Sequence, residues 1–229
     1  MAYIYLLLAA IFWGGNYVVS RVMVFHLPPG LLAEARWGIA ALLLLIMYGK
    51  QVAHNKQLLK KSWLRTAFLA LFGPVLFPTT LYIGLQYTTA LNAAILLSSS
   101  PTLVLLINAV IFRDRINLHN IVGVCLSWFG VIYLLTHGHI DRLFDLSIGV
   151  GEMWAFLSAL SWAIYCSSLR IRDKNIPGTT FLTVSAVFGA IMLAPYAIYE
   201  VDLPSLYRTH FFSILRSTFK RNRGLVVNS

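Results

Sequence analysis

Seven long apolar runs constrain what this chain can fold into. They cover residues 3–24, 31–48, 63–85, 90–112, 121–136, 151–169 and 181–199. A helix of about 20 apolar residues crosses the hydrocarbon core of a bilayer, where every backbone polar group needs a partner inside the protein. The runs are continuous and do not alternate, which argues against β-barrel strands. The sequence therefore predicts an all-α, polytopic membrane helix bundle of about seven transmembrane helices.

The composition supports lipid as the solvent of this chain. Hydrophobic residues make up 59% of it and charged residues 11%, whereas soluble domains carry roughly 25% charged residues. The net charge of +10 is therefore assigned to lipid headgroups and not to nucleic acid. The two cysteines, Cys125 and Cys166, lie inside apolar runs and indicate neither a disulfide framework nor a metal site.

The basic residues are distributed unevenly between the loops. One set of loops contains most of them: Lys50, Lys56, Lys60, Lys61, Arg65, Arg113, Arg115, Arg170, Arg172 and Lys174. The opposite set contains Arg21 and Arg142. Because Lys and Arg favour cytoplasmic loops, we expect a multi-pass protein of the cell (inner) membrane with a cytoplasmic N-terminus.

An internal repeat relates two of the predicted helices. Residues 8–21 and 157–170 align at an offset of 149 residues, which pairs Trp13 with Trp162 and Arg21 with Arg170. The second copy begins five runs after the first, so it crosses the membrane in the opposite sense. Inverted repeats let the two halves of a transporter expose one central site to either side in turn. The repeat therefore favours a transporter.

The repeat also predicts the domain organisation. We expect a first five-helix repeat at 1–136, a linker at 137–150, a partial second, inverted repeat at 151–204 and a basic, non-spanning tail at 205–229. The tail would face outside, against the charge rule that the other loops obey. Two interpretations stay open, of which we favour the first: a sequence foreign to the original design, or an interfacial helix with Phe211, Phe212, Leu215 and Phe219 on one face.

Several motifs in order resemble the EamA-type family of the drug/metabolite transporter superfamily. They are FWGGNY at 12–17, ARW at 35–37, the stretch 84–101 that enters the fourth run, and FRDR at 112–115. The last occupies the place of a Leu-Gly-Glu-Arg ending, with Asp114 for the Glu and Arg113 for the Gly. The resemblance implies ten helices in two repeats, so that this chain would be truncated at its C-terminus.

The resemblance further implies transport of small metabolites by alternating access, with efflux as the expected direction, and it does not name the substrate. Whether the 229-residue chain transports by itself stays open. The alternative is a non-transporting membrane fragment or scaffold. A seven-helix photoreceptor is disfavoured, since the last run contains no Schiff-base lysine.

No motif in the sequence indicates an enzyme. A P-loop, a Gly-rich dinucleotide turn and a Ser/His/Asp arrangement with supporting context are all missing from the sequence. His137 and His139 could bind a metal, but no third ligand cluster is visible in the sequence, and they are interpreted as loop residues. We therefore expect no cofactor and no metal, with the lipid bilayer and a small-molecule substrate as partners, and a homodimer as an arrangement that the sequence allows.

Polar and aromatic side chains within the runs mark the candidate substrate site, because polar groups in a bilayer usually face the protein interior. Arg36 lies near the start of the second run, where it suits an anionic group or a gate. The alternative for Arg36 is a side chain that reaches to lipid headgroups. For the other residues the alternatives are helix packing and local hydrogen bonds. The predicted substrate-binding residues are Trp13, Asn16, Tyr17, Arg36, Asn92 and Ser99.

Two stretches predict irregular helices. Pro74 and Pro78 lie one turn apart in the third run and predict a kink, or a hinge, there. The sequence Ser-Ser-Ser-Pro at 98–101 predicts a bend in the fourth run, because proline frees a backbone carbonyl that serine hydroxyls can satisfy.

Overall fold

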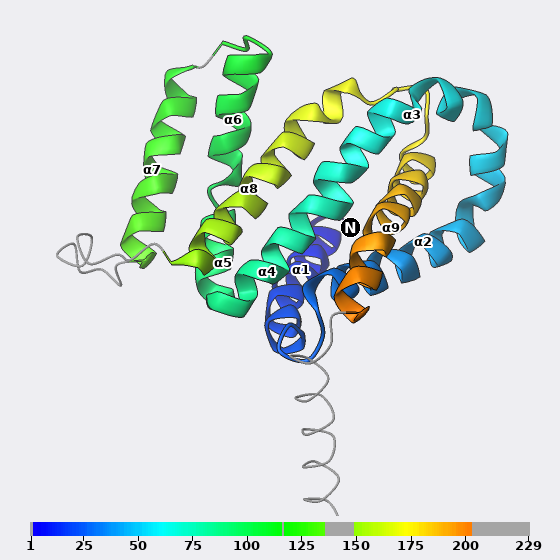
Figure 1. The fold of residues 1–229 in the computed structure, drawn as a ribbon. Helices are drawn as coiled ribbons and strands as arrows, with labels where there is room; N and C mark the ends of the chain where they lie inside the picture. Colours follow the sequence, from blue (N-terminus) through cyan, green and yellow to red (C-terminus); the bar gives the residue numbers. More distant parts are fainter. Residues whose placement is uncertain (1, 116, 136–148, 203–229) are drawn as a thin grey trace, which may run out of the picture.

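The computed structural model describes residues 2–115, 117–135 and 149–202, and every regular element within these ranges is helical (Figure 1). The all-α prediction is therefore confirmed for the described part of the chain. The elements are α1 (Ala2–Met23), α2 (Pro29–His54), α3 (Lys56–Ala70), the π-helix η1 (Leu71–Leu76), α4 (Phe77–Tyr87), α5 (Ala90–Leu97), α6 (Ser100–Ile111), α7 (Leu118–Leu135), α8 (Val150–Ser168), the short 3₁₀ helix η3 (Leu169–Ile171) and α9 (Gly178–Asp202).

Five helical stretches of the described chain are long and apolar enough to cross a membrane. They are Tyr3–Met23, Pro29–His54, Lys56–Tyr87, Ala90–Ile111 and Gly178–Val201. The chain is thus a multi-pass helical membrane bundle. The fifth and sixth predicted spans also fold as helices, α7 and α8, but neither reaches the combined length and apolar composition of these five stretches. For α8 the physical reason is that Glu152 and four serines lower its hydropathy, and neighbouring helices bury the side chains of these serines.

The third predicted span is one bent rod made of α3, η1 and α4. Pro74 lies inside the π-helix η1, where it lacks the N–H that a regular helix needs, so the regular α-helix is interrupted at the position of the predicted kink. Two hydroxyl groups of α8 bind carbonyl groups of this bent region. Ser161 Oγ donates to the Phe72 carbonyl at 3.0 Å, and Ser158 Oγ donates to the Phe77 carbonyl at 2.8 Å. The bend therefore helps to hold α8 in place.

The predicted bend in the fourth span is also confirmed. α5 ends at Leu97 and α6 begins at Ser100, so that two residues interrupt the helix. The hydroxyl groups of Ser98, Ser99 and Ser100 donate to the carbonyl groups three residues earlier, at 2.5 to 2.6 Å. Ser100 thus satisfies the Leu97 carbonyl, which Pro101 cannot bind, while the Ile95 and Leu96 carbonyl groups also accept the backbone N–H groups of Ser98 and Ser99.

α4 and α8 approach each other closely at small residues. A Cβ atom on Gly84 would lie 3.1 Å from the backbone nitrogen of Ala155 and 3.1 Å from the carbonyl oxygen of Gly151. Small residues let membrane helices pack backbone to backbone. Leu81, Leu85 and Ala155 are buried in the largest core cluster at this contact. α8 is therefore the central helix of the bundle, packed against α4, α5 and α6.

α2 and α9 pack along each other in antiparallel orientation (Figure 1). Gly30, near the start of α2, contacts Glu200, near the end of α9. Gln51, near the end of α2, contacts Thr179, near the start of α9. The two helices begin 149 residues apart, which is the offset of the sequence repeat. Their opposite orientation is the one that an inverted repeat predicts.

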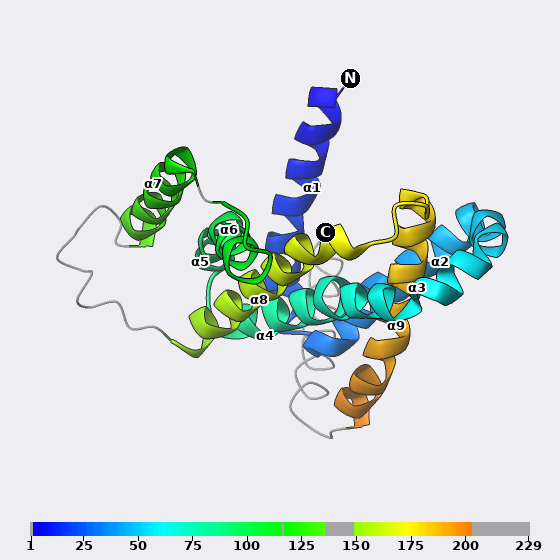
Figure 2. The ribbon, with the colours of Figure 1, turned by 90° about the horizontal axis from the view of Figure 1, so that it is seen from above.

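α1 is the least enclosed of these helices. In the view from above it extends away from the other helices (Figure 2). Phe12 is 75% exposed, and no atom other than the helix's own backbone or its chain neighbours lies within 4 Å of a Cβ placed on Gly14 or Gly15. Within the described residues, no second backbone therefore approaches these glycines closely.

Most of the predicted linker and the whole predicted tail lie outside the described residues, as do His137, His139 and Arg142. The domain boundaries, and both interpretations of the tail, therefore stay predictions.

Candidate functional site

Three aromatic side chains from three helices belong to the largest core cluster, in which Tyr17 and Tyr82 are buried and against which Trp37 packs. Tyr17 comes from α1, Trp37 from α2 and Tyr82 from α4. Arg36 lies over the Tyr82 ring, with its guanidinium carbon 5.7 Å from the ring centroid, and it donates a hydrogen bond to the Tyr82 hydroxyl. We call Tyr17, Arg36, Trp37 and Tyr82 the aromatic–arginine cluster. Within this cluster Arg36, an exposed residue, contacts Tyr82.

The aromatic–arginine cluster contains hydrogen-bonding groups without partners. The Tyr17 hydroxyl and the Trp37 indole N–H are buried, and neither has a hydrogen-bond partner among the described residues. One carboxylate oxygen of Glu34, on the same helix, is in the same situation. A buried polar group that is left unpaired costs about 1–3 kcal/mol. A ligand that bonds to these groups would remove that cost, which favours ligand binding at this place.

Arg36 has no acidic partner within the described part of the chain. Its spacing of two residues from Glu34 places the two side chains on different helix faces, and no ion pair joins them. A charged side chain in a membrane helix is costly unless a partner neutralises it. Guanidinium groups bind carboxylate and phosphate groups through two parallel hydrogen bonds. The aromatic–arginine cluster is thus suited to an anionic group.

Trp13, a predicted site residue, belongs to a second group of aromatic side chains. Its ring centroid lies 5.5 Å from that of Trp162, edge to face. Trp162 in turn contacts Phe77 at 4.8 Å and Tyr165 at 5.2 Å. Trp13 and Trp162 occupy equivalent positions of the repeat. A two-fold axis that relates the two copies would therefore pass through this contact. The pair therefore marks the point where the two copies of the repeated helix meet.

Three other predicted residues make local contacts. The Asn16 side-chain oxygen accepts a hydrogen bond from Ser20 Oγ at 3.2 Å, within α1. The Asn92 backbone N–H is capped by Thr89 Oγ1 at the start of α5. Ser99 is buried, and its hydroxyl is used at the break between α5 and α6. Of the six predicted residues, Tyr17 lies in the core cluster that also contains Tyr82, the partner of Arg36, and the other four make the contacts described above.

Trp37 and Tyr82 are not among the site residues that the sequence predicts. Each is an aromatic side chain with a polar tip inside an apolar run, and Trp37 directly follows Arg36. Those signals alone do not show that α2 and α4 bring the two residues together. Tyr82 comes 46 residues after Arg36, so only the packing of the helices reveals their contact.

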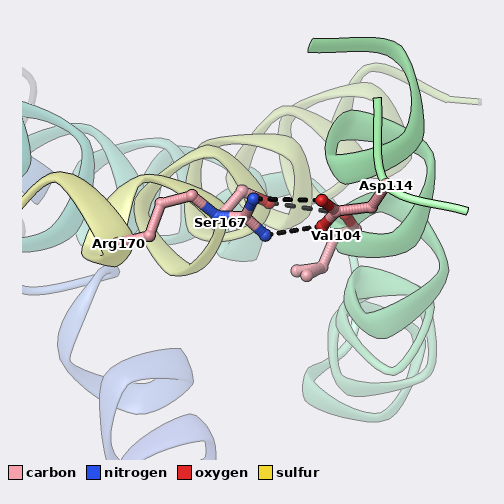
Figure 3. Close-up of polar contacts among 4 residues, drawn as sticks. All are labelled: Val104, Asp114, Ser167 and Arg170. Atoms are coloured by element: carbon pink, nitrogen blue, oxygen red, sulfur yellow. Dashed lines mark hydrogen bonds and ion pairs between the residues drawn. The ribbon is translucent and has the colours of Figure 1, made fainter. Parts of the chain in front are cut away.

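A charged contact joins the end of α6 to the end of α8 (Figure 3). Two hydrogen bonds connect Arg170 to Asp114, at 2.7 and 3.3 Å. One turn earlier, Ser167 Oγ donates to the Val104 carbonyl at 3.4 Å. The hydrogen bonds from Arg170 lower the pKa of the Asp114 carboxyl, and they raise the pKa of the Arg170 guanidinium. Both side chains are exposed, so we assign this pair to the attachment of the two helices and not to ligand binding.

The first 136 residues match the model of the EamA-like transporter family. Among curated proteins, the chain is 28% identical to the uncharacterized transporter YyaM of Bacillus subtilis, over 89% of this chain and 67% of that protein. It is 25% identical to the uncharacterized transporter YetK of Bacillus subtilis, over 88% and 61% of the two chains. It is 28% identical to an uncharacterized transporter of Archaeoglobus fulgidus, over 84% and 65%.

The chain thus spans about two thirds of the length of these relatives. No solved structure matches it.

Proposed function

Because this chain belongs to the EamA-like transporter family, we propose that it carries small metabolites out of the cell by alternating access, with its N-terminus in the cytoplasm. The antiparallel α2–α9 pair, which follows the repeat offset of 149 residues, supports this proposal. An inverted pair of helices can open toward either side of the membrane by the same motion. The substrate would pass through as a bound ligand, without covalent chemistry.

We propose that the aromatic–arginine cluster contacts the substrate. The observation that carries this proposal is Arg36, a cation in a membrane helix whose described partner is a tyrosine and not an acid. Arg36 would bind an anionic group of the substrate. The unpaired Tyr17 hydroxyl and Trp37 N–H would bind a second polar group of the same molecule.

The other predicted residues keep a supporting role in this proposal. Trp13 would form an aromatic wall at the contact between the repeated helices. Asn16, Asn92 and Ser99 would line the wider path. The side-chain hydrogen bonds of Asn16 and Ser99 would have to exchange for substrate contacts, whereas the hydrogen bond of Asn92 uses its backbone N–H. Their substitution should therefore affect transport less than substitution of Arg36.

An efflux measurement tests the proposal for Arg36. Liposomes that contain the purified 229-residue chain are loaded with a mixture of carboxylate, phosphate, neutral and cationic metabolites, and release is followed by mass spectrometry. We expect Arg36→Ala to reduce efflux of the anionic compounds at least about tenfold, the loss typical of one charged hydrogen bond. Arg36→Lys should retain part of the activity, because lysine keeps the positive charge but lacks the planar guanidinium group that forms two parallel hydrogen bonds.

Arg172→Ala is the matched control for this experiment. Arg172 also lies over an aromatic ring, 5.4 Å from the centroid of Phe181, but it follows η3 in the connection to α9. We expect its substitution to leave efflux unchanged. Wild-type efflux of anionic compounds by Arg36→Ala would contradict the proposed role of Arg36.

The second candidate function is a non-transporting membrane scaffold. The exposed face of α1, which includes Phe12, Val18, Val19 and Val22, favours it, because such a face suits a protein partner as well as lipid. Absence of efflux for every compound in the mixture, from a chain that keeps its helical circular dichroism, would favour the scaffold. Efflux above that of empty liposomes would exclude it.

A further inference from the structure

The two ends of the α2–α9 pair are joined by one contact that the internal repeat produces twice. At one end Gly30 binds Glu200, and at the other end Thr179 binds Gln51. At the offset of 149 residues, Thr179 is the equivalent of Gly30, and Glu200 is the equivalent of Gln51. A contact in which each partner has its repeat equivalent in the other contact is what two-fold symmetry produces. We call these contacts the Glu200 clasp and the Gln51 clasp.

The Glu200 clasp completes the start of α2. The first backbone N–H groups of a helix have no partner inside the helix, and the residue before α2, Pro28, has no side chain that can cap them. Glu200 Oε2 accepts from the Gly30 N–H at 2.7 Å and from the Leu31 N–H at 3.3 Å. A carboxylate is favoured at this position by the positive end of the helix dipole. α9 thus supplies the cap that α2 lacks.

Gly30 makes room for the Glu200 clasp. A Cβ atom at this position would lie 2.4 Å from Cδ1 of Tyr196 and 2.7 Å from Oε2 of Glu200. Such distances are too short for real contacts, so a side chain on Gly30 would displace the Tyr196 ring and the Glu200 carboxylate. The clasp therefore depends on the absence of a side chain at residue 30 as well as on the carboxylate.

The Gln51 clasp is weaker by its chemistry. Thr179 Oγ1 donates one hydrogen bond to Gln51 Oε1, at 2.9 Å. Both groups are neutral and both residues are exposed. Charge-assisted hydrogen bonds are roughly twice as strong as neutral ones, and the Glu200 clasp has two of them. The same contact is thus strong at one end of the helix pair and weak at the other.

We propose that the two clasps are the end gates of the α2–α9 pair, and that their unequal strength keeps the Glu200 end closed while the Gln51 end opens. This inference rests on the proposed alternating-access function. With the N-terminus in the cytoplasm, the Gln51 end faces the cytoplasm and the Glu200 end faces outside. The resting protein is then open to the cytoplasm, as an efflux carrier needs to be in order to bind its substrate.

Distances across the two ends test the gates without any transport measurement. In the chain with Cys125→Ser and Cys166→Ser, spin labels at Ala35→Cys and Ile198→Cys report the Glu200 end. Labels at Met47→Cys and Leu182→Cys report the Gln51 end, and all four positions are exposed. When both clasps keep their native residues, we expect a narrow distance distribution at the Glu200 end and a broad one at the Gln51 end.

Two variants loosen the Glu200 clasp by different means. Glu200→Gln gives it the neutral amide of the Gln51 clasp, and Gly30→Ala displaces its partners. Each should increase the long-distance population at the Glu200 end on the order of fivefold, which is the difference between a charged and a neutral hydrogen bond. Glu152→Gln, the same chemical change at an acid that binds Thr88 on another helix pair, is the control and should have no effect.

The outcomes separate this inference from the proposed transport. The proposal that the clasps act as gates would be contradicted if the spin-label distance distribution at the Glu200 end is unchanged in both variants, provided that circular dichroism shows the helical content of wild type. A wild-type distribution that is broader at the Glu200 end than at the Gln51 end would contradict it as well. If the distances shift as expected but no compound is released from liposomes, the results support the proposed gates and contradict the proposed transport.

Discussion

At the scale of single residues, Tyr17 is buried like a core residue but has an unpaired polar group, as a binding-site residue can. Its side chain is buried, and its hydroxyl has no partner among the described residues. A residue selected for packing alone would be phenylalanine here. The hydroxyl therefore points to a use other than stability, and a ligand in the aromatic–arginine cluster provides one.

Tyr17→Phe should thus separate stability from function. Removal of an unpaired buried hydroxyl avoids its desolvation cost, so we expect the free energy of unfolding to rise by up to about 1–2 kcal/mol. Efflux of anionic compounds should fall, because the substrate loses a hydrogen bond. Thermal unfolding in detergent and liposome efflux measure the two effects. A variant that is less stable than wild type would contradict the assignment of an unpaired hydroxyl.

Arg113 is a residue whose backbone conformation suits another amino acid. Its φ angle is 57°, in the left-handed region that glycine adopts without strain. It follows the end of α6, where Phe112 N–H and Asp114 N–H both bind the Asn108 carbonyl. It also occupies the place of the glycine in the family motif that the sequence resembles. Helices commonly end on such a left-handed residue, which is usually glycine.

Arg113→Gly should therefore stabilise the protein. We expect a gain of roughly 1 kcal/mol, the cost of a left-handed conformation for a residue with a side chain. Arg115→Gly is the control, because Arg115 is a nearby exposed arginine without a positive φ angle. It should gain nothing. A midpoint of thermal unfolding that does not rise for Arg113→Gly would contradict this explanation.

At the scale of elements, the bent rod α3–η1–α4 and α8 depend on each other. The bend exposes carbonyl groups of Phe72 and Phe77, and α8 supplies the hydroxyl groups that bind them. The same serines make α8 less apolar than the other membrane helices. α8 can be polar because its polar side chains are buried against the bend and not exposed to lipid.

Removal of these hydroxyl groups should weaken the contact between α8 and the bent rod. We expect Ser158→Ala and Ser161→Ala each to lower the free energy of unfolding by about 0.6–1.7 kcal/mol, the range measured for hydrogen bonds between membrane helices. Ser167→Ala is the control, because its hydrogen bond to Val104 is longer, at 3.4 Å. Its effect should be smaller. Equal losses in all three variants would contradict a special role of the bend.

At the scale of the whole molecule, the inverted repeat organises the helices. Trp13 and Trp162 contact each other, and the two clasps join α2 and α9 at both ends. The three contacts share one offset in the sequence. One pseudo-two-fold relation therefore describes the first two helices of each repeat.

The proposed orientation of the molecule can be tested with cysteine labelling in whole cells. In the Cys125→Ser, Cys166→Ser background, a membrane-impermeant maleimide should label Tyr87→Cys and should not label Lys56→Cys. Both positions are exposed and lie at opposite ends of the α3–η1–α4 rod. Permeabilised cells, the control, should label both. Labelling of Lys56→Cys alone in intact cells would reverse the orientation and with it the side on which the Glu200 clasp lies.

The sequence by itself determined the helical fold and its interruptions. Apolar runs, prolines and serine clusters act within one segment, so the kink at Pro74 and the break at Ser98 follow from local chemistry. The repeat likewise predicted that equivalent helices cross the membrane in opposite senses, while the packing of α2 against α9 was not predicted. The family, too, follows from motifs along the chain.

Only the tertiary structure decided which polar groups meet. Arg36 finds Tyr82, Gly30 finds Glu200, and Ser158 finds Phe77 across large separations in the sequence. Hydropathy does not encode how a membrane helix is rotated about its axis when lipid and protein neighbours are equally apolar. That rotation is set by small residues and by hydrogen bonds between helices. The candidate site and the two clasps therefore emerge only from the packed structure.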